Sequence, residues 1–102
     1  MTEAQKMYLE IGKQLEGAVE SQLFGKPCFK INGKSFCCFF QDEMVFKLNG
    51  EIHREALGLN GSQLFDPSGK KRPMKEWVQI SFSKSKQWEK YAKAAMVYVG
   101  GK

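Results

Sequence analysis

Residues 28–40 read CFKINGKSFCCFF, and this stretch decides the fold. Apolar Phe29 and Ile31 alternate with their neighbours in the first half, and residues 35–40 form a second strand-like run. Between the two runs, Asn32-Gly33 supplies the positive φ angles of a two-residue type I′ turn. The stretch therefore predicts an antiparallel β-hairpin.

The segment before this hairpin predicts a helix. Apolar side chains recur at spacings of three and four between Ala4 and Val19, and Thr2 is placed to cap the first turn. The pattern ends near Ser21-Gln22, and Gly25-Lys26-Pro27 prevents its continuation. We therefore expect one helix from the capping Thr2 to about Gln22.

The segments after the hairpin predict three more strands and two more helices. They are a strand at 44–48, a short helix at 50–57 capped by Asn49 and ended by a left-handed Gly58, a strand at 63–65, an exposed connector at 66–73, a strand at 74–82, and a helix that begins at Ser83 or Ser85 and stops at Gly100-Gly101. The order is α-β-β-β-α-β-β-α. This order predicts an α+β fold of two layers, an antiparallel five-stranded sheet with helices on one face.

Length and composition predict a single domain over residues 1–102. The chain is 42% hydrophobic and 13% aromatic, which is enough apolar side chain for a core without disulfides or a structural metal. No apolar run is long enough to cross a membrane, and the first twenty residues do not resemble a signal peptide. We therefore expect a cytoplasmic protein with no membrane partner.

The cysteine and histidine content supports the same compartment. Three cysteines, with Cys37 and Cys38 adjacent, make a poor disulfide framework for a secreted protein. His53 is the only histidine, and no cysteine pair has the spacing of a zinc site. We expect no bound metal and no cofactor.

Positive charge collects at the carboxy-terminal end of the chain. Residues 69–102 contain nine basic and two acidic residues, within a net charge of +5. A one-sided positive field can attract nucleic acid, although a lysine-rich stretch is more often a solvated surface. The candidate nucleic-acid-binding residues come from one loop, the strand after it and one helix: Lys70, Lys71, Arg72, Lys75, Lys86, Lys90 and Lys93.

The sheet face without helices is a second candidate surface. Strict alternation places Phe39, Val45 and Trp77 on that face, where large aromatic side chains would meet water. Such a patch predicts a homodimer or a protein-partner interface. The alternatives are that other residues cover the patch, or that one strand is shifted by one residue, which would turn its side chains inward.

Catalytic motifs are missing from the sequence. It has no glycine-rich phosphate loop and no hydrolase elbow, and His53 is expected to be an ordinary exposed histidine between Glu51 and Glu55. Counting from the Asn32-Gly33 turn places Cys28 opposite Cys37, which allows a redox pair. Two small apolar residues packed on a sheet explain the same pattern.

Several segments together carry a family resemblance. These segments are Phe24-Gly25, the Asn32-Gly33 hairpin with Phe36, residues 44–48, and Met74 through Ile80 leading to Trp88, Tyr91 and Ala95. Together they resemble the amino-terminal domain of the TfoX/Sxy competence-regulator family, whose architecture the YjbR-like proteins share. The resemblance implies a two-layer α+β domain of bacterial proteins linked to transcriptional control of DNA uptake, with no catalytic residues to transfer. Full-length members carry a further carboxy-terminal helical domain, and residues 1–102 are expected to correspond to the amino-terminal domain alone.

Taken together, the residues and the resemblance predict a small non-catalytic binding or regulatory module. A nucleic-acid-binding protein that uses the basic loop and helix is one alternative, and an enzyme of unassigned chemistry is the other.

Overall fold

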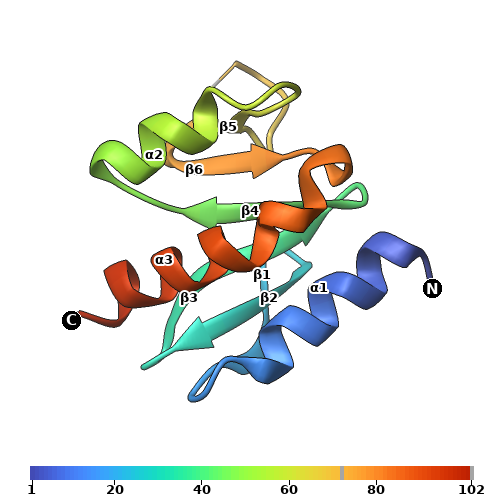
Figure 1. Ribbon diagram of the computed structural model, residues 1–102, viewed down its shortest axis with the longest axis vertical. Helices are drawn as coiled ribbons and strands as arrows, with labels where there is room; N and C mark the ends of the chain where they lie inside the picture. The colour runs from blue at the N-terminus through green and yellow to red at the C-terminus, as the bar shows by residue number, and fades with distance from the viewer. Residues whose placement is uncertain (72, 102) are drawn as a thin grey trace.

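The computed structural model describes residues 1–71 and 73–101, which form one antiparallel sheet with helices packed against one face (Figure 1). The strand order is β1-β2-β3-β4-β6-β5. The elements are α1 Glu3–Gln14, β1 Val19–Leu23, β2 Lys26–Ile31, β3 Lys34–Phe40, β4 Glu43–Lys47, α2 Gly50–Leu57, β5 Gln63–Phe65, β6 Met74–Ile80, the 3-10 helix η1 Phe82–Gln87 and α3 Trp88–Gly100. The predicted α+β class is confirmed, and the sheet has six strands where five were expected.

Helix α1 is shorter than its apolar pattern suggested. Thr2 caps it as expected, because its hydroxyl oxygen accepts a hydrogen bond from the backbone N–H of Gln5 at 3.1 Å. The helix ends at Gln14, and Gly17 has a φ of +91°, a conformation that L side chains rarely adopt. The expected continuation to Gln22 is therefore wrong. Residues 19–23 instead form β1, the additional strand at the edge of the sheet.

Strands β1 to β4 form a meander joined by three two-residue turns. The turn residues Phe24-Gly25, Asn32-Gly33 and Gln41-Asp42 all have positive φ angles between 52° and 79°. Positive φ at both central residues is the conformation of a type I′ turn, whose twist matches that of the flanking strands. The hairpin predicted around Asn32-Gly33 is confirmed, and equivalent turns stand on both sides of it.

A β-bulge in β3 changes the face that each following residue occupies. Next to the turn, Ile31 pairs with Lys34 and Lys30 pairs with Ser35, but Phe29 pairs with Cys37 and Cys28 with Cys38. Phe36 is therefore an extra residue, and Phe36 and Cys37 both belong to the core under the helices. The predicted pairing of Cys28 with Cys37 is wrong by one residue.

The main core lies between the sheet and the helices α1 and α3. Tyr8 of α1 contacts the rings of Phe29 and Phe39, with centroids 5.1 Å away in each case. Helix α1 lies so close to β2 that a Cβ atom on Gly12 would be 2.0 Å from the Phe29 ring. The other large buried residues of this core are Phe36, Met44, Phe46, Leu48, Ile80, Trp88 and Tyr91.

A second apolar cluster fills the opposite face of the sheet. It contains the buried residues Cys28, Cys38, Val45, Phe65 and Trp77, and Leu23, Phe40 and Met74 pack around them. The rings of Phe40 and Phe65 are 5.2 Å apart, although β3 and β5 are separated by β4 and β6. Flat strands three positions apart would be about 14 Å from each other. The sheet therefore curls around this cluster, and its own side chains cover the face.

The carboxy-terminal elements differ from their predicted bounds. Strand β6 ends at Ile80, and Ser81 caps the 3-10 helix η1, so α3 begins only at Trp88. Helix α2 has its predicted bounds, but Gly58 after it has a φ of −79°, so the expected left-handed conformation is wrong. Helix α3 ends as predicted, at the left-handed Gly101.

Candidate functional site

The basic connector between β5 and β6 is exposed at residues 68–71 and 73, as its sequence predicted, while Asp66 and Pro67 are half-buried. The Asp66 side chain shapes it, because Oδ1 accepts hydrogen bonds from the backbone N–H groups of Ser68 and Gly69 at 3.2 and 3.1 Å. Lys70 and Lys71 follow this turn with exposed side chains, and so does Lys75 at the start of β6. Arg72 lies outside the described residues. No ion pair involves Lys70, Lys71 or Lys75 in the described part of the chain, so their charges face solvent.

The helix lysines are in a different electrostatic environment. Lys90 forms an ion pair with Glu55 of α2, and Lys93 forms one with Glu89 at 3.3 Å. Each pair removes a free positive charge from the surface of α3. Lys86 lies in η1 beside α1. Of the predicted lysines, Lys90 and Lys93 are therefore compensated by glutamates, whereas Lys70, Lys71, Lys75 and Lys86 take part in none of the ion pairs of the described residues.

Glu55 connects α2 to α3 through two hydrogen bonds. Its Oε2 accepts a bond from the Lys90 ammonium group and a 2.8 Å bond from the Tyr91 hydroxyl. Both hydrogen bonds lower the pKa of Glu55 below 4.5, and the bond from Lys90 contributes more than the bond from Tyr91. Burial and the carboxylate of Glu55 raise the pKa of Tyr91 to about 12. These charges hold two helices together and are not free to bind a ligand.

Of the three residues predicted to form an exposed interface, two are buried, and Phe39 is half-buried on the other face of the sheet. Val45 is fully buried and Trp77 is only 6% exposed, because both belong to the second cluster on the curled face of the sheet. Phe39 lies on the helix side and packs against Tyr8, because the bulge at Phe36 reversed the alternation. The expected exposure of all three side chains is wrong.

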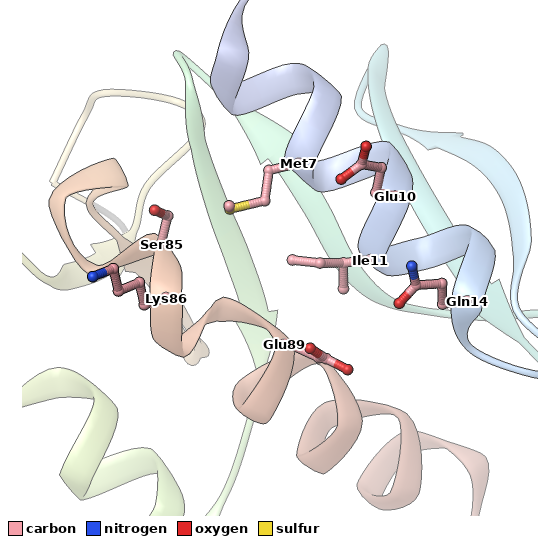
Figure 2. Close-up of a pocket in the computed structure, with 7 residues that line it drawn as sticks. All are labelled: Met7, Glu10, Ile11, Gln14, Ser85, Lys86 and Glu89. Carbon is pink, nitrogen blue, oxygen red and sulfur yellow. The ribbon is translucent and has the colours of Figure 1, made fainter.

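A cleft between α1 and the start of α3 is a site that the sequence reasoning missed. It has a volume of about 250 Å³ and is lined by Met7, Glu10, Ile11, Gln14, Ser85, Lys86 and Glu89. Figure 2 shows the Met7 and Ile11 side chains pointing from α1 toward η1, while the amino group of Lys86 points away from α1. The cleft thus has an apolar floor and acidic groups at its edge.

One signal for this cleft is visible in the sequence. Met7, Glu10, Ile11 and Gln14 follow the spacing of three and four that aligns side chains along one side of a helix. That row lies beside the apolar stripe that contacts the sheet and shares Ile11 with it. The sequence alone does not indicate that η1 and α3 lie across from this row, since that placement depends on the tertiary fold.

The cysteines and the histidine are engaged inside the fold. Cys28, Cys37 and Cys38 are buried free thiols. Burial raises the pKa of Cys38 to about 12 and raises that of Cys37 well above 9.0, which keeps both thiols protonated. His53 Nε2 lies 2.7 Å from the backbone carbonyl oxygen of Lys75 and donates a hydrogen bond to it. His53 therefore joins α2 to β6.

Two features are absent from the part of the chain that the structure describes. No group of three or more His, Cys, Asp or Glu side chains in residues 1–71 and 73–101 is arranged to hold a metal ion. In the same residues, no helix combines the length and apolar character that crossing a bilayer requires.

Comparison with known proteins adds no relative. No family model matches the chain, and the searches of curated proteins and of solved structures returned no significant match.

Proposed function

We propose that the domain is a non-catalytic binding module that recognises a short segment of a partner protein in the cleft between α1 and α3. The observation that carries this proposal is the composition of the cleft. Met7 and Ile11 offer apolar surface, and Glu10 and Glu89 place negative charge beside it. Such a combination provides both apolar burial and orientation by charge.

The size of the cleft favours a side chain over a whole cofactor. Sites for drug-sized molecules usually measure about 300–1,000 Å³, whereas this cleft measures about 250 Å³. It has room for one or two side chains of a peptide, with the rest of the peptide on the surface.

The charges of the cleft define the chemistry of its ligand. Two carboxylates line it, and the amino group of the one lysine is directed away from α1 (Figure 2). An apolar side chain next to a lysine or arginine would place its methyl groups against Met7 and its charge near Glu89. We therefore infer a partner segment with adjacent apolar and basic residues.

A non-catalytic role agrees with how the titratable groups are used. Polar atoms of His53, Glu55 and Tyr91 form hydrogen bonds that connect elements of the fold. The resemblance to the TfoX/Sxy amino-terminal domain makes bacterial transcriptional regulation the setting that we propose for this binding. Three free thiols agree with a cytoplasmic location.

The proposal is tested by titrating the protein with two tripeptides and following backbone amide signals by NMR. We expect acetyl-Lys-Leu-Lys-amide to shift the signals of Met7, Ile11 and Glu89, and acetyl-Glu-Leu-Glu-amide to leave them in place. Because Met7 supplies part of the apolar floor, Met7→Ala should weaken binding of the basic peptide by about fivefold.

The matched control is Val97→Ala, which removes a similar exposed apolar side chain farther along α3. This variant should bind the basic peptide as the unchanged protein does. Equal losses in the two variants, or signal shifts that avoid the cleft, would refute the proposal.

A second candidate function is contact with nucleic acid through the connector between β5 and β6. The observation in its favour is that Lys70, Lys71 and Lys75 are exposed and take part in none of the ion pairs of the described residues. Such contacts release counterions from the phosphate backbone, so their affinity depends on salt and little on sequence.

The salt dependence of binding to duplex DNA distinguishes this candidate. Changing Lys70, Lys71 and Lys75 together to Ala should reduce the slope of log affinity against log salt by about two to three. Lys90→Ala with Lys93→Ala is the control, because both lysines are already paired with glutamates. If no complex forms at low salt, or both sets of changes alter the slope alike, the connector is not a nucleic-acid site.

A further inference from the structure

Strand β1 leaves one side of its backbone open. It is the first strand of the sheet order and is hydrogen-bonded only to β2 among the described residues. Val19 is 62% exposed, and Phe24 in the turn after the strand is 57% exposed. The opposite edge, β5, has only three residues, so β1 is the longer of the two open edges.

This edge lacks the features that usually prevent association. Natural edge strands are blunted by lysines, prolines, bulges or a covering segment. The sequence of β1 is Val-Glu-Ser-Gln-Leu, with a single charged residue, and its five pairs with β2 run without a register shift. The two register shifts of the sheet occur elsewhere, between β2 and β3 and between β5 and β6.

The pattern of side chains on β1 is complementary to itself. In an antiparallel pair of β1 strands centred on Ser21, Glu20 of each copy lies opposite Gln22 of the other, and Val19 lies opposite Leu23. The amides of Gln22 can then donate to the carboxylates of Glu20 at two equivalent places. All five residues of each strand are paired, and no like charges meet across the seam.

Other registers and other edges fit less well. A centre at Glu20 would place the two carboxylates directly opposite each other, which destabilises a strand pair. Pairing β1 with β5 of another copy would use only three residues of β5 and would build an open series of copies instead of a closed pair.

The buried cluster on the curled face would extend across the same seam. Leu23 is partly buried and packs against the cluster that contains Cys28 and Trp77. Val19, Ser21 and Leu23 alternate along one face of β1, the face on which Ser21 pairs with buried Cys28. The exposed Val19 of one copy would therefore cover Leu23 of the other.

We propose that the chain forms a two-fold symmetric dimer in which β1 pairs with β1 of a second copy, antiparallel and centred on Ser21. The resulting sheet has twelve strands, because each copy contributes its sheet of six. An antiparallel continuation of one sheet places both helix layers on the same face, so the two clefts beside α1 open to one side.

Light scattering over a range of protein concentrations tests the dimer. We expect the mass to rise from 11.6 kDa toward twice that value as concentration increases. Gln22→Glu should raise the dissociation constant about tenfold, because it places two glutamates opposite each other at two positions. The double change Glu20→Lys with Gln22→Glu should restore dimerisation, since each lysine then faces a glutamate.

The matched control is Gln63→Glu, which makes the same chemical change on the β5 edge. It should leave the dissociation constant unchanged. A mass of 11.6 kDa at every concentration would overturn the proposal, as would equal effects of Gln22→Glu and Gln63→Glu. A mass that rises beyond that of two copies would also overturn it, because it would indicate the open series in which β1 pairs with β5 of the next copy.

Discussion

At Gly12, helix α1 lies directly on the ring of Phe29. A Cβ atom there would be 2.0 Å from that buried ring. Alanine favours a helix over glycine by about 1 kcal/mol, but forcing extra volume into a packed core costs about 1–3 kcal/mol. We therefore expect Gly12→Ala to lower the free energy of unfolding measured in urea, even though alanine has the higher helix propensity.

Gly58→Ala is the comparison for this substitution. Gly58 has an ordinary helical conformation, and a Cβ atom there would lie 3.5 Å from the nearest carbonyl oxygens. The change should alter stability by no more than about 0.5 kcal/mol. If Gly12→Ala is equally harmless, the close packing of α1 on β2 is not rigid.

The β-bulge at Phe36 marks the point at which the alternating pattern of β3 stops predicting the face of each residue. Counting from Asn32-Gly33 gave the correct pairs next to the turn, Ile31 with Lys34 and Lys30 with Ser35. The extra residue Phe36 then reversed the faces of every later position in β3. An apolar run such as Phe-Cys-Cys-Phe-Phe is compatible with either face, so the sequence contains no mark of the bulge.

The junction of α2 with α3 depends on a charged group that titrates in acid. The pKa of Glu55 is lowered by its hydrogen bonds with Lys90 and Tyr91. A carboxyl group whose pKa is lower in the folded state adds stability above its ordinary pKa, and that stability is lost as the pH falls through the lowered value. We expect Glu55→Gln to lower the melting temperature at neutral pH and to flatten its decline below about pH 4.5.

Glu89→Gln serves as the control for this pH dependence. Glu89 pairs with Lys93 on its own helix, and among the described residues no hydrogen bond or ion pair connects it to a second element. Its substitution should leave the melting temperature and its dependence on acid almost unchanged. An equally steep acid decline in Glu55→Gln and in the unchanged protein would show that Glu55 does not stabilise the junction.

At the scale of elements, local signals predicted most of the secondary structure. Turn residues correctly located the central hairpin and the end of α3, and α2 and β5 have their expected bounds, although the Asn49 side chain forms no capping hydrogen bond and Gly58 is not left-handed. The apolar spacing of α1 continues into Ala18 and Val19 and so predicts helix where β1 begins, although Gly17 interrupts the run. Two ion pairs compensate the positive charge of Lys90 and Lys93 on α3. Only the pair of Lys93 with Glu89, four residues apart on one helix, can be recognised from the sequence.

At the scale of the molecule, the central strands of the sheet are buried on both faces. Helices cover one face, and the curl that brings Phe40 to Phe65 closes the other. The sequence identified Trp77 as lying on the face without helices but not its burial, because sheet curvature arises from contacts between distant strands. The cleft beside α1 could not be predicted for the same reason, since α1 and α3 meet only in the folded chain.

One tryptophan reports on each of these cores, which allows a test of whether they unfold together. Trp88 lies under the helices and Trp77 lies on the curled face. Strands β2, β3, β4 and β6 contribute side chains to both cores, so we expect one cooperative transition. In Trp77→Phe and in Trp88→Phe, the remaining tryptophan fluorescence and the far-ultraviolet circular dichroism should give the same urea midpoint. Different midpoints within one variant would mean that one core melts first.

The position of β6 between β4 and β5 affects the chain while it is being synthesised. Among the described residues, β5 pairs only with β6, and β4 pairs with β6 on the side away from β3. Strand β6 comes after both in the sequence. A nascent chain that has emerged only as far as the basic connector therefore carries an unpaired β5 and an uncovered β4 with Met44 and Phe46. Until Met74–Ile80 arrives, that half-built sheet is the form of this protein most exposed to aggregation and most in need of a chaperone.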